Sequence, residues 1–173
     1  MCQSLPYGPA GAGAGTFRRG LEGGLLTMIG RLHHIVLDCP DPDVLARFYS
    51  ELLGWPVTWR HDIWVVVAAD SRTSGLAFQR VAGYQAPDWP DPARPQQLHL
   101  DVMVDDVDAA DPLVLALGAR RLPIDDLDQG WRVYADPAGH PFCLIPRPSW
   151  APPIRASSGE QAGRPAAGEQ AGS

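Results

Sequence analysis

Two histidines and two aspartates are the residues of this chain whose types and spacing could support chemistry. His34 and Asp38 fall in one β-rich run, and His99 and Asp101 fall in another. Because residues two positions apart in a strand share a face, each aspartate is expected on the same face as its histidine. On a concave, half-buried surface such carboxyls are suited to acid–base catalysis. The alternative is that both lie near strand ends, in water or paired with an arginine.

The two histidines also open two copies of an internal repeat, a pattern best sought before any other. An aspartate follows each histidine at the same distance, and an apolar run then ends at a Leu-Gly pair. Gln79 follows His34 at nearly the spacing at which Cys143 follows His99, and each ends a Gly-x2-Phe-x segment. The repeat predicts two copies of one module, with these four residues related by a pseudo-twofold axis.

Hydrophobic periodicity predicts the same order of elements, a strand, a helix and three strands, in both copies. The strands are expected at 31–38, 55–60, 62–69 and 75–81, and at 97–104, 119–123, 131–136 and 141–146. Asp41-Pro42 predicts the start of the first helix and Gly54 its end. The second helix should run to Leu117, and Pro112 implies that it is kinked or begins only at Asp111.

The predicted fold class is therefore α+β. Tandem βαβββ modules, 31–82 and 96–146, form paired half-barrel sheets that face each other across a central cleft. The proline-rich segment 83–95 is interpreted as the linker between the modules. Residues 1–30 and 147–173 have the composition of disordered extensions. Met28, just ahead of the first strand, is interpreted as the natural start.

Composition excludes several classes of function. All 14 basic residues are arginine, so neither a Schiff-base lysine nor a phosphate-loop lysine exists. The net charge is −6 and no basic cluster occurs, so nucleic acid is not an expected partner. No run approaches the roughly 20 apolar residues of a membrane helix. The three cysteines are widely spaced and odd in number, which favours a cytoplasmic location over a disulfide-bonded secreted protein.

The chain resembles the vicinal oxygen chelate superfamily, which includes glyoxalase I, fosfomycin- and bleomycin-resistance proteins and extradiol dioxygenases. The resemblance covers about 31–146 and is closest to the glyoxalase-like branch. It rests on four motifs: the His-x6-Asp opening at His34, Phe48-Tyr49-x3-Leu53-Gly54-Trp55, the second opening at His99, and Asp136-Pro137-Ala138-Gly139. It implies the paired-module fold and a homodimer, but it does not specify an activity.

By that resemblance, metal ligands come from the first and last strands of each module, at His34, Gln79, His99 and Cys143. Hard cations favour carboxylate oxygens, which positions 79 and 143 do not supply. A Cys143 thiolate would instead suit Zn²⁺. His34 and His99 are thus candidate ligands of a divalent Zn, Co or Fe ion, with Gln79 and Cys143 at the remaining ligand positions. The alternative is a metal-free cleft with two hydrogen-bonded histidines.

Two functions follow as expectations. The first is a metal-dependent lyase, isomerase or dioxygenase that acts on a small molecule, with Asp38 or Asp101 as the helper. The second is a metal-free small-molecule binder, like the drug-sequestering members of the superfamily. Glyoxalase I activity itself is not expected, because the last-strand carboxylates are missing. His61 and His140 are expected in turns, exposed to solvent.

Overall fold

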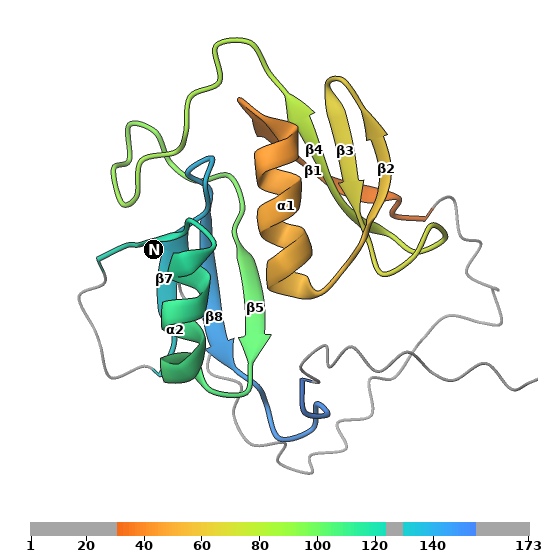
Figure 1. Cartoon of the computed structure of the whole chain (residues 1–173). Helices are drawn as coiled ribbons and strands as arrows, with labels where there is room; N and C mark the ends of the chain where they lie inside the picture. Colours follow the sequence, from red (N-terminus) through yellow and green to blue (C-terminus); the bar gives the residue numbers. More distant parts are fainter. Residues whose placement is uncertain (1–30, 124–129, 155–173) are drawn as a thin grey trace, which may run out of the picture.

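The computed structural model describes residues 31–123 and 130–154, and these residues form two βαβββ modules (Figure 1). The first module comprises β1 (His34–Cys39), α1 (Pro42–Leu53), β2 (Val57–His61), β3 (Trp64–Val67) and β4 (Gly75–Arg80). The second comprises β5 (Leu100–Val104), α2 (Val107–Ala116), β6 (Arg120–Arg121), β7 (Arg132–Ala135) and β8 (Pro141–Pro146). The predicted fold class and order of elements are confirmed.

Each module forms its own four-stranded sheet, and the two sheets share one topology. The strand orders are β1-β4-β3-β2 and β5-β8-β7-β6. In both sheets the first and last strands of the module pair in parallel, and the other neighbours pair antiparallel. The sheets are not closed into a barrel. Equivalent residues of the two modules therefore lie on equivalent strands, as the repeat predicts.

Helix α1 begins at the aspartate that the sequence marks, and Asp106 caps α2 in the same way. The Asp41 carboxylate accepts hydrogen bonds from the backbone N–H groups of Asp43 and Val44, at 2.9 and 3.4 Å, and Pro42 occupies the first turn. Gly54 ends α1 with a φ of 66°, a left-handed conformation that glycine adopts without steric cost. These predictions of the cap, the first-turn proline and the stop are confirmed.

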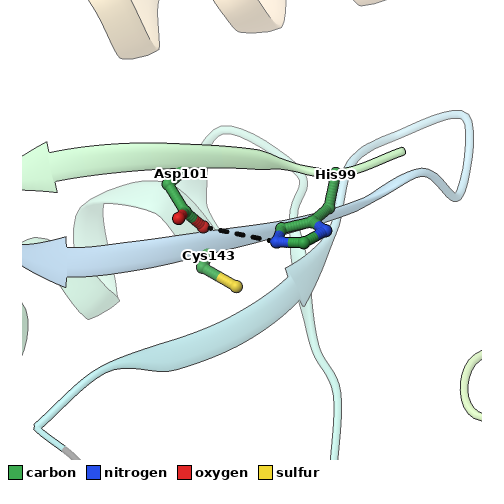
Figure 2. A group of neighbouring side chains, drawn as sticks. All are labelled: His99, Asp101 and Cys143. Atoms are coloured by element: carbon green, nitrogen blue, oxygen red, sulfur yellow. Dashed lines mark ion pairs between the residues drawn. The ribbon is translucent and has the colours of Figure 1, made fainter. Parts of the chain in front are cut away.

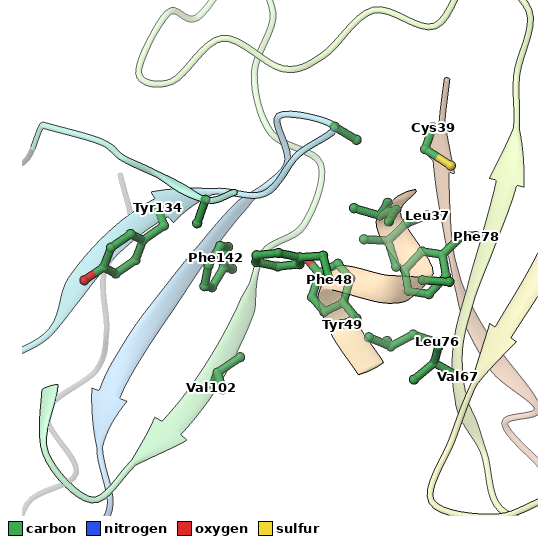
Figure 3. Packing of buried hydrophobic residues seen from close by; sticks show 14 of the residues in the cluster. Leu37, Cys39, Phe48, Tyr49, Val67, Leu76, Phe78, Val102, Tyr134 and Phe142 are labelled. Carbon is green, nitrogen blue, oxygen red and sulfur yellow. The ribbon is translucent and has the colours of Figure 1, made fainter. Parts of the chain in front are cut away.

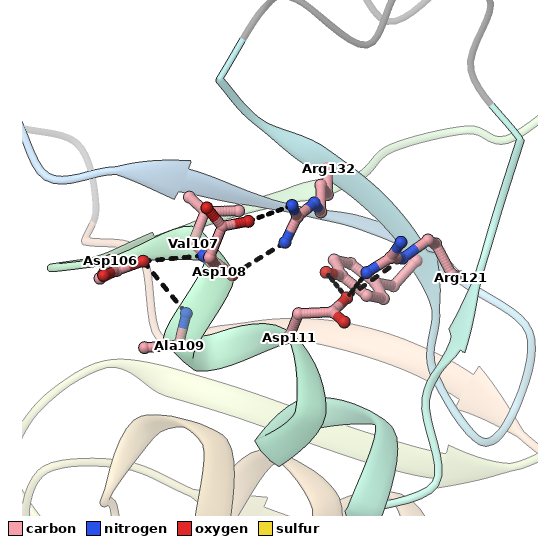
Figure 4. A network of polar contacts seen from close by, with 8 residues as sticks. Asp106, Val107, Asp108, Ala109, Asp111, Arg121 and Arg132 are labelled. Atoms are coloured by element: carbon pink, nitrogen blue, oxygen red, sulfur yellow. Dashed lines mark hydrogen bonds and ion pairs between the residues drawn. The ribbon is translucent and has the colours of Figure 1, made fainter.

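Helix α2 begins at Val107 and continues through Pro112, so the alternative of a start at Asp111 is wrong. The lost backbone donor at Pro112 is offset by contacts that hold α2 to β6 and β7 (Figure 4). Arg132 donates to the Val107 carbonyl at 3.2 Å and pairs with the Asp108 carboxylate. Asp111 accepts from Arg121 Nε at 3.1 Å and from the Tyr134 hydroxyl at 2.6 Å.

One hydrophobic core joins the two modules, because α1 lies between the sheets (Figures 1 and 3). Tyr49 of α1 stacks on Phe78 of β4, with ring centroids 5.4 Å apart. Phe48, the preceding residue of the helix, meets the ring of Phe142 on β8 edge to face, with ring centroids 5.7 Å apart. Tyr134 stacks on the other side of Phe142 at 5.5 Å. The two modules thus share one cluster of buried hydrophobic residues.

The folded part extends beyond the predicted end at 146. Arg147 donates its backbone N–H to the Val104 carbonyl at 2.8 Å, and its guanidinium pairs with Asp105. The Ile154 N–H reaches the same Asp105 carboxylate at 3.0 Å, and Ala151 is buried. Residues 147–154 are therefore packed on the second module, and the predicted tail boundary is corrected. The other predicted extensions, 1–30 and 155–173, lie outside the described residues.

No helix in the described part of the chain is long and apolar enough to cross a membrane.

Candidate functional site

The first module places His34 and Asp38 on the same face of β1, as side-chain alternation predicts. Leu37 and Cys39 point into the core, so the intervening residues point to the opposite, free face of the sheet. The register separates His34 from Gln79, because His34 pairs with Gly75 whereas Gln79 pairs with Asp38. Four register positions correspond to roughly 13 Å along the strands. Gln79 therefore lies beside Asp38 rather than beside His34.

His34 has another imidazole as its close neighbour. Its ring centroid lies 3.8 Å from that of His33. Partial burial, and secondly the neighbouring His33, lower the pKa of His34. Both causes favour a neutral imidazole at this position.

The second module brings His99, Asp101 and Cys143 together (Figure 2). Cys143 on β8 pairs in register with Asp101 on β5, and His99 immediately precedes β5 on the same face. One ligand atom from each of the three lies within 4.8 Å of the others, and His99 Nε2 is 3.6 Å from Asp101 Oδ1. Cys143 is buried, while His99 and Asp101 are partly exposed. A nitrogen, an oxygen and a sulfur donor thus meet at one place.

Of the four residues that the repeat and the resemblance single out, the structure gathers two, His99 and Cys143, and adds Asp101. His34 and Gln79 are not part of this group. Their assignment as metal ligands stays a prediction. The donor set of the group, imidazole, carboxylate and thiolate, matches the ligands that Zn²⁺ accepts.

A buried carboxylate at the turn between β7 and β8 forms a second cluster of polar groups. The Asp136 side chain is 0% exposed. Its Oδ1 accepts the backbone N–H groups of Ala138 and His140, both at 2.9 Å. Its Oδ2 accepts the Tyr49 hydroxyl at 3.0 Å and lies 2.9 Å from His140 Nδ1. Four donors around one buried side chain are the surroundings of an ionised carboxylate, which only accepts.

Two neighbours of Asp136, the Tyr49 hydroxyl and His140 Nδ1, each direct a hydrogen toward its carboxylate. Burial, and secondly the Asp136 carboxylate, raise the pKa of Tyr49 well above its ordinary value. The hydroxyl therefore stays a donor. Because a carboxylate cannot donate, His140 must carry its proton on Nδ1, and its Nε2 is left as an acceptor.

His140 is half-enclosed rather than solvated, so the expectation that it lies in solvent is wrong. Its side chain is 16% exposed. Its Nε2 lies 3.0 Å from the hydroxyl of Tyr84, a residue of the linker, and the two rings are 5.6 Å apart. With Nε2 as acceptor, the Tyr84 hydroxyl is the donor. Burial first, and Asp136 second, raise the pKa of Tyr84, which keeps that proton in place.

The Tyr84 end of this chain of hydrogen bonds borders a cavity of about 400 Å³ between β1 and the linker. We call it the linker cavity and define it by Val36, Asp38, Tyr84, Arg94, Leu98 and His140. Asp38 has no ion pair among the described residues, whereas the Arg94 guanidinium lies 2.7 Å from the Asp88 carboxylate. Asp38, a predicted catalytic residue, thus borders the cavity, but Asp101 does not.

The linker is held against the β7–β8 turn by a close approach at Gly139. A Cβ at this position would lie 2.6 Å from the Ala86 Cβ, and the φ of 95° is one that other residues rarely adopt. The glycine of Asp136-Pro137-Ala138-Gly139 is therefore required for the linker to close over the cavity.

Neither Tyr84 nor His140 was predicted to have a functional role from the sequence. Asp136 and His140 are four residues apart in a Gly-containing turn, a local pattern that could have suggested a side-chain contact. Tyr84 lies in the linker, 56 positions before His140, and no local sequence pattern predicts that the two residues are in contact.

Comparison with known proteins identifies the family. A family model described as "Glyoxalase-like domain" matches residues 34–145, which is more than half of the chain. The chain belongs to this family, and its fold is that of the vicinal oxygen chelate superfamily.

Solved structures agree on the fold. A glyoxalase/bleomycin resistance protein/dioxygenase family enzyme from Burkholderia phytofirmans PsJN is 18% identical, with a TM-score of 0.50 over 68% of this chain and 98% of that one. A glyoxalase-related enzyme from Fulvimarina pelagi is 25% identical, with a TM-score of 0.50 over 70% and 91%. A possible glyoxalase from Bacillus cereus is 16% identical, with a TM-score of 0.50 over 68% and 99%. No curated protein matches the chain significantly.

Proposed function

We propose that this glyoxalase-like protein binds a small organic molecule in the linker cavity. The observation that carries the proposal is the cavity itself, whose volume of about 400 Å³ falls within the range of small-molecule sites. Its wall combines apolar side chains, such as Val36 and Leu98, with a few polar groups that can orient a ligand.

The polar groups favour a ligand that is not an anion. Asp38 carries a negative charge with no paired cation among the described residues, while the positive charge of Arg94 is offset by Asp88. The Tyr84 hydroxyl donates its hydrogen bond to His140, so its oxygen can still accept a hydrogen bond from a ligand. The favoured ligand is therefore small, neutral or cationic, and carries an N–H or O–H donor.

Filling the cavity should abolish binding. Val36 and Met103 are both 40% exposed on the free faces of β1 and β5, but only Val36 borders the cavity. With nitroindazole, a flat N–H donor, as the probe in calorimetry, Val36→Trp should weaken binding by about tenfold or more. The matched variant Met103→Trp should bind as the unmodified protein does. Equal affinities for all three proteins would contradict the proposal.

A second candidate function is metal binding by His99, Asp101 and Cys143, favoured by the proximity of their three ligand atoms. The thiolate favours Zn²⁺ or Co²⁺ over Mg²⁺ and Mn²⁺. Such an ion, when bound, would polarise an oxygen of a ligand as a Lewis acid. The protein would hold the three metal-ligand atoms in place and leave the side with the partly exposed His99 and Asp101 open to a bound molecule.

Titration with Co²⁺ should produce thiolate charge-transfer absorption, and binding should strengthen as pH rises, because the thiol must lose its proton. Cys143→Ser should abolish the signal. Cys39→Ser is the matched control, since Cys39 is equally buried, and burial raises the pKa of its thiol to about 11. A signal that survives in Cys143→Ser would rule this site out.

We also propose a cytoplasmic location and a homodimer. The location is supported by the free thiols of Cys39 and Cys143, and the dimer by the resemblance alone.

A further inference from the structure

The hydrogen-bonded chain that starts at buried Asp136 ends at the wall of the linker cavity. We propose that Tyr84 is a proton-exchanging residue for a molecule in this cavity, with His140 and Asp136 as the relay that takes up and returns its proton. The inference rests on the proposed function, because it requires a bound molecule. It adds an activity, general acid–base catalysis, and a substrate class.

The geometry fixes the direction of the relay. Asp136 is saturated with donors, so His140 Nδ1 holds a proton that it cannot give up easily. His140 Nε2 is consequently the only ring nitrogen that can accept, and the Tyr84 hydroxyl donates to it across 3.0 Å. Tyr84 and His140 both border the cavity, so the relay lies at its wall.

The step involves only proton transfer. An acidic C–H or N–H bond of the bound molecule breaks, and its proton moves to the Tyr84 oxygen while the Tyr84 proton moves to His140 Nε2. The electron pair stays on the substrate, which becomes an anion, and His140 becomes an imidazolium paired with the Asp136 carboxylate. Because burial and Asp136 raise the pKa of Tyr84, a free phenolate is disfavoured, and the two transfers are coupled.

The charged groups around Tyr84 define the substrate class. Asp38 borders the cavity and Asp136 lies behind His140, so a molecule that is already anionic is repelled. The other titratable neighbours, Cys39 and Tyr49, are buried, and burial raises the pKa of both groups, which keeps them neutral. Arg94 also borders the cavity, but its positive charge is offset by Asp88. The substrate is therefore a small neutral carbon or nitrogen acid that becomes anionic only after the transfer.

Nitrobenzisoxazole is a suitable probe, because a general base removes its ring C–H proton, the N–O bond breaks and a coloured cyanophenolate forms. The protein should accelerate this ring opening, with the proton passing through Tyr84 to His140 Nε2. Tyr84→Phe and His140→Gln should each lower kcat by about tenfold or more with a smaller change in KM. Tyr134→Phe and His61→Gln are matched controls outside the cavity and should react as the unmodified protein does.

The outcomes separate the two proposals. Loss of rate in both relay variants, with nitroindazole binding still detectable, supports the inference, and either variant suffices if the other fails to fold. Three results overturn the relay and leave the binding function standing. They are binding without acceleration, an unchanged rate in Tyr84→Phe, and a loss of rate in Asp38→Asn while Tyr84→Phe remains active. If neither probe binds, the proposed function fails, and the relay fails with it.

Discussion

Replacement of Asp136 by alanine should lower the free energy of unfolding by about 3–5 kcal/mol, the cost of removing one member of a buried charged network. The change leaves four donors without their acceptor: the Tyr49 hydroxyl, two backbone N–H groups and His140 Nδ1. Each buried donor left unsatisfied costs about 1–3 kcal/mol, although the costs are not additive. Urea-induced unfolding followed by tryptophan fluorescence measures the loss.

Two variants calibrate the Asp136 measurement. Asp62 lies exposed in the turn between β2 and β3, and Asp62→Ala should change stability by no more than about 0.5 kcal/mol. Tyr49→Phe removes one of the four donors and leaves no unsatisfied donor behind. It should therefore lower the free energy of unfolding by less, about 1 kcal/mol. A loss below about 1 kcal/mol for Asp136→Ala would show that the carboxylate does not hold this turn together.

Phe142→Ala should cost about 3–5 kcal/mol, since it empties a buried aromatic site between α1 and the second sheet. Phe142 touches Phe48 of the first module and Tyr134 of the second, so its loss weakens both. Calorimetry should show one transition at a lower temperature rather than two. Leu113→Ala, at an exposed position of α2, is the control and should leave the transition in place. Two separate transitions would contradict a shared core.

Much of the fold could be predicted from the sequence because it is encoded in local, repeated signals. Asp41-Pro42, Gly54 and Asp106 mark helix ends through contacts made within one turn of the chain. The repeat then assigns equivalent strands without any knowledge of long-range contacts. The end of the folded region was missed, because the proline-rich composition of 147–154 gives no sign of the contacts of Arg147 and Ile154 with Asp105.

The candidate site was harder to predict, since it depends on register and on contacts between distant segments. Sequence spacing treats His34 and Gln79 as the counterparts of His99 and Cys143. The register, however, pairs Gln79 with Asp38, four residues after His34, but pairs Cys143 with Asp101, only two residues after His99. A register difference of two residues keeps the same side chains on the core face but changes the cross-strand neighbour of every side chain. Tyr84 and His140 were missed because only the folded linker brings them together.

The most direct test of the linker cavity as the ligand site is an amide chemical-shift titration of the full-length protein with nitroindazole. We expect the largest perturbations at Val36, Asp38, Tyr84 and His140, which border the cavity. Perturbations centred instead on His99, Asp101 and Cys143 would contradict this expectation and would place the ligand on the free face of the second sheet.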